Sequence, residues 1–457
     1  MDSGTRSSDE SRLPSLHICI SHTEQAATLP RFNFPQLRRR RREHVAMVRD
    51  WSGLPEELLV SFLLAMDVPA AVHSGAVCTS WNAAYTAFRR LRAPSPRKTP
   101  CLLYASGALA PGAAALHCPA TGTTLQIPFP RAPLHRRPLL GSGHGWVVTA
   151  DEASNLHLLN PVTGAQAALP PVTALHNVRM GTDQRGGPVY AVYEEPGSKL
   201  KILEIDRAHE YLYDRVVLSA SPSAGRACVV LLLHTPMGEV SFARLGDDRW
   251  TCWVDAPGDG TELLWRRFYK DAMYSDVDGL FYLLLINGSI SPVARKILHS
   301  VPGALHAPIK YLVQTPTGGI LQVWRLKNHV ESLEPADILQ EYMDKEGGQD
   351  PCLEHITVDI KIYKVDLHGQ RLELMKGLPD HALFLGFNAS MCLPVKELFH
   401  GLKPNCAYIT DDCLKCMNFR KYSQREVGIW SMAEQSMSKL VDVSPVLYPW
   451  LNWPSPI

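Results

Sequence analysis

The sequence lacks an apolar run long enough to cross a membrane. Its longest apolar runs are short, such as Phe281–Ile286 and Val229–Leu233, whereas a spanning helix needs about 20 apolar residues. The first residues, MDSGTRSSDESR, are polar and charged, so we expect no secretory signal. The formal net charge is only +1, which leaves no global field to attract nucleic acid or an anionic membrane. We therefore expect neither a membrane nor a nucleic acid as a partner.

Cysteine is too sparse and scattered to form a disulfide scaffold. The chain has 11 cysteines in 457 residues, whereas disulfide-stabilised domains are small and dense in cysteine. The pattern indicates reduced thiols, and we expect the protein in the nucleus and/or the cytoplasm.

Recognisable catalytic motifs are also missing. The chain has no G-x-S-x-G elbow, no Walker loop and no H-E-x-x-H pair. The glycine-rich stretch Gly141–Gly145 runs into the strand-like residues Trp146–Thr149, which favours a tight turn over a phosphate-binding loop. Isolated histidines in the β-rich segments are explained more simply by packing or surface exposure than by catalysis: His144, His157, His234 and His381.

A partial zinc motif lies near the C-terminus. Cys413-x-x-Cys416, with Cys406 and His400 nearby, has the spacing of half a zinc site. The second half is missing, so ordinary thiols explain these cysteines better. We expect no catalytic residue, no cofactor and no metal, and we expect that the chain is not an enzyme.

From residue 101 onward the sequence is typical of a mainly β fold. Short β-prone runs alternate with Gly, Pro, Asn and Asp turns at intervals of about ten residues. Roughly 340 residues of short strands exceed a sandwich, and at about 40–50 residues per blade they predict a β-propeller of about six to eight blades. The clearest strands are expected at 145–149, 156–159, 189–193, 200–205, 227–233, 280–286, 311–314, 320–324 and 356–365.

Residues 51–92 predict three helices. Pro55 suits a first helical turn, and an apolar face follows it at Leu58, Leu59, Phe62 and Leu63. Asp67-Val68-Pro69 separates this helix from the next one, and Thr79 or Ser80 can cap the third. About forty residues are too few to bury a sufficient core alone, so the apolar face is expected to dock against something else.

The remaining segments complete the expected domain layout. Residues 1–50 predict a disordered basic tail whose five arginines, Arg38–Arg42, suit a nuclear import signal, a polyanion contact or, as we favour, a solvated arm. A proline-rich linker is expected at 93–100, the propeller at 101–440 and a C-terminal tail at 441–457. Residues 327–352 carry seven acidic residues against two lysines and are interpreted as an acidic insertion.

The helical segment resembles the F-box, a module that docks on a Skp-family adaptor of a cullin-RING ubiquitin ligase. The matching residues are Leu54, Pro55, Leu58, Leu59, Phe62, Leu63, Val77, Cys78 and Trp81. The segment departs from the family at Ala65 and at Ser74–Ala76, where basic residues are common. Gly75 is expected to cost a helix about 1 kcal/mol against alanine, and the departures imply an adaptor affinity below that typical of the family.

The β region resembles the KIB-type β-propeller of plant F-box proteins. The resemblance rests on several blocks in one order: 145–171, 276–290, 311–325, 358–367, 381–395, 401–412 and 427–432. Together the two resemblances imply a substrate-recognition subunit of an SCF-type ubiquitin ligase, in which the adaptor links a cullin scaffold and the propeller recruits an unknown client protein.

The resemblance also implies which residues contact the adaptor. The expected set is Leu54, Pro55, Leu58, Leu59, Leu63, Val77, Cys78 and Trp81, some of which can instead hold the three helices together. Two alternatives remain open. The first helix can pack on the propeller as an intramolecular cap, or the chain can be a non-ubiquitinating interaction protein with a vestigial F-box.

Overall fold

The computed structural model describes 51–91, 99–105, 109, 113–128, 139–193, 200–235, 239–253, 269–285, 290–292, 309–331, 353–395, 401–410, 412, 426–440 and 446–451. Several predictions lie outside these residues. They concern the basic tail 1–50 with Arg38–Arg42, nearly all of the linker 93–100, and the acidic insertion after Glu331. The zinc half-motif residues His400, Cys413 and Cys416 also lie outside them.

The three predicted helices are present. A short 3-10 turn, η1 (Trp51–Gly53), precedes α1 (Glu56–Ala65), α2 (Val68–Gly75) and α3 (Thr79–Leu91). Glu56 and Glu57 occupy the first turn of α1, where the helix dipole favours negative charge. Asp67 caps α2, because its side chain accepts a hydrogen bond from the Ala70 amide at 2.8 Å. The third helix already begins at Thr79, so Cys78 rather than Thr79 or Ser80 precedes its first turn.

The helices enclose a small apolar core of their own. Its buried members come from all three helices: Leu59, Leu63, Ala71, Ala84 and Phe88. Side chains packed against them are Leu54, Val60, Leu64, Met66, Trp81 and Tyr85. We call residues 51–91 the helical module.

Gly75 has a role that differs from the helix-weakening role expected for it. It is the last residue of α2, and a Cβ atom added there would meet Tyr85 Cδ1 of α3 at 2.7 Å. The missing side chain therefore allows α2 to approach α3. Asn82 Nδ2 also donates a hydrogen bond to the Gly75 carbonyl oxygen at 2.9 Å.

Gly75→Ala is predicted to destabilise the helical module, although alanine is the better helix former. Overpacking against Tyr85 is expected to cost about 1–3 kcal/mol, more than the gain in helix propensity. Thermal unfolding followed by far-UV circular dichroism would measure this effect. The matched control is Gly53→Ala, because no atom lies within 4 Å of a Cβ added there; equal stability of the two variants would contradict the prediction.

The rest of the described chain is built of antiparallel sheets, apart from one parallel pair, β22 with β24. Sheet I contains β1 (Cys101–Ala105), β2 (Ala113–His117), β3 (Thr124–Pro128) and β27 (Val446–Leu451). Sheet II contains β4 (Leu139–Gly143), β5 (Trp146–Ala150), β6 (Leu156–Leu159) and β7 (Gln166–Ala168). Sheet III contains β8 (Val178–Thr182), β9 (Pro188–Val192) and β10 (Lys201–Glu204).

Four further sheets follow in chain order. Sheet IV contains β11 (Tyr213–Leu218), β12 (Val229–His234), β13 (Glu239–Arg244) and β14 (Thr251–Trp253). Sheet V contains β15 (Tyr269–Ser275), β16 (Leu280–Leu285) and β17 (Ile290–Pro292). Sheet VI contains β18 (Ile309–Gln314), β19 (Ile320–Glu331), β20 (Leu353–Asp366) and β21 (Arg371–Met375). Sheet VII contains β22 (His381–Leu385), β23 (Met391–Pro394), β24 (Cys406–Ile409), β25 (Gly428–Ser431) and β26 (Ser436–Lys439). The short helices η3 (Val172–Ala174) and α4 (Ala208–Leu212) lie between successive sheets, and η4 (Pro222–Ala227) lies between β11 and β12 of sheet IV.

Six of these sheets follow one another as neighbours. One strand of each contacts the corresponding strand of the next, in the order β27, β4, β11, β15, β18 and β23. A shared apolar core then joins sheet VII to sheet I, with Phe384 and Tyr408 in the same cluster as Leu102 and Leu116. The predicted mainly β, propeller-like architecture is therefore confirmed, and six sheets of the described part of the chain form the ring.

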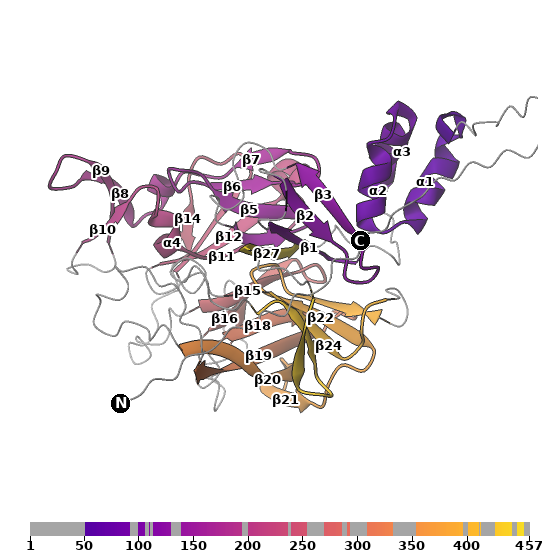
Figure 1. Ribbon diagram of the computed structural model, residues 1–457. Coiled ribbons are helices and arrows are strands. Elements are labelled where there is room, and N and C mark those ends of the chain that lie inside the picture. Colours follow the sequence, from indigo (N-terminus) through magenta and orange to yellow (C-terminus); the bar gives the residue numbers. More distant parts are fainter. Residues whose placement is uncertain are drawn as a thin grey trace, which may run out of the picture. The chain divides into compact units, whose positions relative to one another are not determined.

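Sheet III lies outside this ring. Strand β4 of sheet II contacts β11 of sheet IV directly, and Figure 1 shows β8, β9 and β10 projecting away from the other strands. Sheet III joins the neighbouring core through Val178, Tyr190 and Val192, and Leu203 of β10 packs against the same core. The β-prone runs at 189–193 and 200–205 thus form strands as predicted, but not a blade of the ring.

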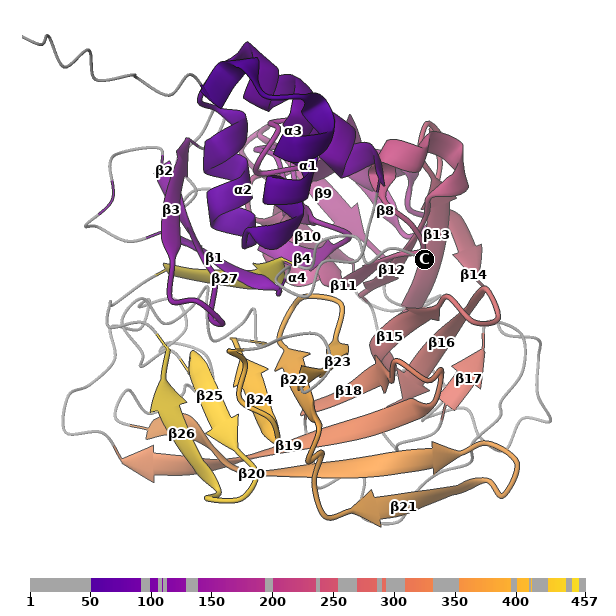
Figure 2. The same ribbon diagram turned by 90° about the vertical axis from the view of Figure 1, so that its right-hand side faces the viewer.

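Residues 446–451 form a strand of the sheet system, which corrects the prediction of a tail for this part of 441–457. Strand β27 pairs antiparallel with β1, joining the last strand to the first (Figure 2). The register shifts between Leu102 and Tyr104, where β27 has one residue more than β1, next to Pro449. An edge position and a bulge are the places where a strand tolerates proline, which explains how this segment can join the sheet.

A buried ionic network joins the strands that line the ring. Arg215 of β11 forms an ion pair with Asp271 of β15, with Nε and Oδ1 2.5 Å apart. The guanidinium also donates hydrogen bonds to the carbonyl oxygens of Gly386 at 2.9 Å and Asn388 at 3.0 Å. Asp271 in turn accepts a hydrogen bond from the Leu312 amide of β18 at 2.7 Å. The two side chains thus connect sheets IV, V, VI and VII.

Arg215→Leu is predicted to lower the free energy of unfolding by about 3–5 kcal/mol, because it leaves the Asp271 carboxylate buried without its counter-charge. Urea denaturation would measure the loss. The double variant Arg215→Leu/Asp271→Leu is expected to recover part of it, since no uncompensated charge remains. A single variant as stable as the wild type would contradict this account of the network.

Candidate functional site

Helix α1 is apolar on two sides. Leu59 and Leu63 point into the helical module and are 1% and 0% exposed. Leu58 and Phe62, one turn apart on another side, are 49% and 42% exposed. A surface helix normally has one apolar side, which faces the core, and a polar side, which faces water. The second apolar side of α1 is therefore unusual for a surface that stays in water. The outward side chains of α1 therefore form an apolar surface that a partner can cover.

The predicted adaptor-contact residues divide into three groups by burial. Leu59 and Leu63 are buried and hold the helices together, whereas Leu54, Cys78 and Trp81 are half-buried. The remaining three are exposed: Pro55, Leu58 and Val77, the last at 65%.

Two exposed side chains were not in the predicted contact set. Phe62 lies four residues after Leu58, so the paired pattern Leu58-Leu59 and Phe62-Leu63 already indicated two apolar stripes on one helix. Trp51 of η1 is 52% exposed, and no periodic pattern in the sequence marks it. We call Leu58, Phe62, Val77 and Trp51 the exposed apolar set.

The module attaches to the strands through α2. Val68 is buried in the same core as Leu116 and Ile127 of sheet I, and α2 contacts β3. Asp67 Oδ2 accepts hydrogen bonds from the hydroxyls of Thr121 and Thr123, both at 2.6 Å. The alternative that the first helix caps the propeller through its apolar face is not what the structure shows. It is α2 that contacts β3, whereas Leu58 and Phe62 of α1 stay exposed.

A second buried ionic cluster joins sheets VI and VII. Arg325 of β19 is fully buried, with Nη1 2.6 Å from Asp412 Oδ2 and Nη2 2.7 Å from Glu426 Oε2. Lys327 Nζ lies 3.0 Å from Glu426 and 3.5 Å from Asp412. Tyr311 also donates a hydrogen bond to Asp412. Two positive and two negative charges balance, so the cluster can remain buried without a net charge.

This balance sets the protonation of the two acids. Burial alone would raise the pKa of Asp412, but Arg325 and Lys327 outweigh it and hold the pKa at about 2. The same two cations outweigh burial at Glu426 and lower its pKa. Both carboxylates are therefore charged at neutral pH. They attach the position after β24 and the position before β25 to Arg325 of β19.

Acid is predicted to destabilise the fold through this cluster. A carboxyl with a lowered folded-state pKa contributes stability above its unfolded pKa of about 4, and this stability is lost as the pH falls to about 2. For Asp412 the loss is on the order of 2 kcal/mol. Urea denaturation at several pH values would measure it.

Asp412→Asn is expected to be less stable at neutral pH and to show a shallower decline between about pH 4 and pH 2. The exposed Asp276→Asn is the matched control, with the slope of the wild type expected. An unchanged slope in Asp412→Asn would contradict the assignment.

The glycine-rich stretch is the turn that the sequence predicted. Strand β4 ends at Gly143 and β5 begins at Trp146, with His144 and Gly145 at positive φ of 53° and 77° between them. Two such residues make the tight turn that matches the twist of a hairpin.

Cys406 of the zinc half-motif is buried in β24. In the described part of the chain, no helix has the length and apolar character to span a membrane.

Sheets arranged as successive neighbours and closed by a C-terminal strand define this chain as a β-propeller protein with a helical module in front. A sequence profile of the KIB1-4 β-propeller matches residues 115–431, and the chain belongs to this family. The profile begins after the helical module. A search of curated proteins gave no significant match.

Several solved structures are similar to this chain at a low level. A putative 6-phosphogluconolactonase from Bacteroides uniformis is 13% identical, covering 60% of this chain and 95% of its own, with a TM-score of 0.26. A chain of a nidogen/laminin complex is 10% identical, covering 61% and 93%, with a TM-score of 0.29. YCF48 bound to D1 peptide is 9% identical, covering 49% and 75%, with a TM-score of 0.25.

Proposed function

We propose that this protein is the substrate-recognition subunit of an SCF-type ubiquitin ligase. The helical module docks on a Skp-family adaptor, which links it to a cullin scaffold, and the propeller recruits a client protein for ubiquitination. The observation that carries the proposal is the outward apolar side of α1, with Leu58 49% and Phe62 42% exposed. The resemblance of residues 54–81 to the F-box supports it, and the KIB1-4 β-propeller supports a protein-interaction role for the rest of the chain.

The energetics favour a partner that covers more than the exposed apolar set alone. Full burial of a large apolar side chain contributes about 1.5–3 kcal/mol, and these side chains are already half covered. Association itself costs at least about 4 kcal/mol. A groove that encloses α1 and reaches the half-buried Leu54 and Trp81 would supply the remaining area, as in helix-in-groove recognition.

The proposed role needs no chemistry in the propeller. A ligase receptor raises the effective concentration of the client near the ubiquitin-conjugating enzyme. The propeller has to hold a client, and the helical module has to hold the adaptor.

Leu58→Asp/Phe62→Asp is predicted to abolish co-purification with a Skp-family adaptor, because two carboxylates would be desolvated in the interface. Both positions are exposed, so the circular dichroism spectrum and unfolding temperature should stay near those of the wild type. A pull-down with purified adaptor would measure binding.

The control is Val277→Asp, which changes an apolar side chain of the propeller that is 73% exposed. It should leave adaptor binding intact. Leu59→Asp would not serve, because Leu59 is buried in the module and its substitution would unfold the helices. Absence of adaptor binding by the wild type would favour the alternative of an interaction protein with a vestigial F-box.

A further inference from the structure

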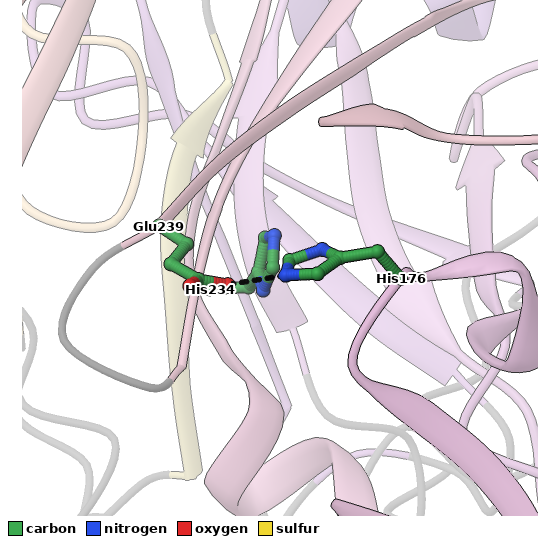
Figure 3. Close-up of side chains that lie close together, drawn as sticks. All are labelled: His176, His234 and Glu239. Atoms are coloured by element: carbon green, nitrogen blue, oxygen red, sulfur yellow. Dashed lines mark ion pairs between the residues drawn. The ribbon is translucent and has the colours of Figure 1, made fainter. Parts of the chain in front are cut away.

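Three metal-ligating side chains meet beside sheet IV. His234 is the last residue of β12 and Glu239 the first residue of β13, and the two pair across the hairpin. His176 comes from the segment between η3 and β8. One ligand atom of each side chain lies within 4.8 Å of the others, and Figure 3 shows the two imidazole rings and the carboxylate pointing toward one another.

We propose that His176, His234 and Glu239 bind a divalent transition-metal ion of the zinc class. Two imidazoles and one carboxylate are a donor set that zinc takes in proteins. His176 Nε2 and Glu239 Oε2 are 3.2 Å apart. Bonds of about 2.0–2.1 Å in a tetrahedral zinc site place neighbouring ligand atoms about 3.3 Å apart, so this edge already fits.

The orientation of His234 suits a metal ligand. Its Nδ1 lies 3.0 Å from the Thr235 carbonyl oxygen, and a carbonyl only accepts, so Nδ1 carries the proton. Nε2 therefore keeps its lone pair, which faces the Ser241 hydroxyl at 2.9 Å. A backbone carbonyl that fixes the tautomer in this way is the usual outer partner of a ligating histidine. The Ser241 hydroxyl can rotate away when a metal takes the lone pair.

The surroundings of the cluster keep both imidazoles in the ligating form. Burial lowers the pKa of His234 to about 4. Burial and, to a lesser extent, the positive charge of Arg179 lower the pKa of His176. Neutral imidazole is the form that binds metals, and burial favours this form at both rings. Arg179 opposes a bound cation, and the Glu239 carboxylate offsets it.

The site is reachable and leaves one position open. Three protein ligands fill three corners of a tetrahedron, and the fourth is available to water or to a partner's side chain. The side chain of His176 is 45% exposed, so an ion can enter from solvent. A bound ion would tie the segment before β8, and with it sheet III, to the β12–β13 hairpin of sheet IV.

A simpler arrangement is a direct contact between His176 Nε2 and Glu239 Oε2 that holds no metal. The chain offers a matched control for it. His157 Nε2 and Asp151 Oδ2 form a similar pair at 3.0 Å, with side chains 27% and 29% exposed. Within the described residues, only His176, His234 and Glu239 bring three such ligands together. A substitution of His157 should therefore remove a histidine–carboxylate contact without changing a metal site.

The test is zinc binding by the full chain after treatment with a chelator. Equilibrium dialysis should show one more tightly bound Zn²⁺ in the wild type than in His176→Ala or Glu239→Gln, and His157→Ala should match the wild type. Zn²⁺ should raise the unfolding temperature of the wild type more than that of the two site variants. Mg²⁺ should produce neither effect, because it prefers oxygen ligands.

Cysteines elsewhere can also bind zinc, so the difference between variants decides. With Co²⁺ in place of Zn²⁺, the wild-type spectrum minus that of His176→Ala should contain ligand-field bands without a thiolate charge-transfer band. Equal ion counts in the wild type and both site variants, or a thiolate band in the difference spectrum, would overturn the proposal. The outcome does not depend on adaptor docking, and circular dichroism verifies that each variant is folded.

Discussion

The ring of sheets depends on the buried guanidinium of Arg215. Apolar contacts between sheets are not directional, so they permit neighbouring sheets to slide. The bonds from Arg215 to Asp271, Gly386 and Asn388 are directional and reach two other sheets. Asn388 also forms a bridge with Ser142 of β4, which brings sheet II to the same place. One side chain therefore sets how the strands that line the ring meet.

The Arg325 cluster applies the same principle away from Arg215. There the long hairpin β19–β20 passes the ends of the segments that lead out of β24 and into β25. Asp412 follows β24 and Glu426 precedes β25, so the two ion pairs attach both of these positions to β19. Attraction between the opposite charges of the cluster, and its hydrogen bonds, offset the desolvation cost of burying them.

Local patterns in the sequence predicted the local elements well. Each of the nine strongest β-prone runs forms a strand, and the three helices begin within a residue or two of their predicted starts. Alternation, turn residues and caps act over a few positions, so they are visible in a single sequence. The Gly141–Gly145 turn was predicted for the same reason.

What the sequence could not predict depends on residues far apart in the chain. Arg215 contacts Asn388, which lies 173 positions later in the chain. The pairing of β27, the position of sheet III and the role of Gly75 each depend on a partner strand or helix that no local pattern identifies. His234 looked like an isolated histidine because His176 lies 58 positions earlier and joins it only through the fold. Such sites need a partner in space before their chemistry becomes visible.

The division of labour within the helical module bears on the proposed function. Bringing a client near a ubiquitin-conjugating enzyme helps only if the adaptor and the propeller keep a fixed geometry. A linker alone would leave that geometry loose. The charged Asp67 side chain caps α2 and also holds Thr121 and Thr123 through short, charge-assisted hydrogen bonds. Attachment through α2 leaves α1 open, so a partner covering Leu58 would be held at a defined position relative to the strands.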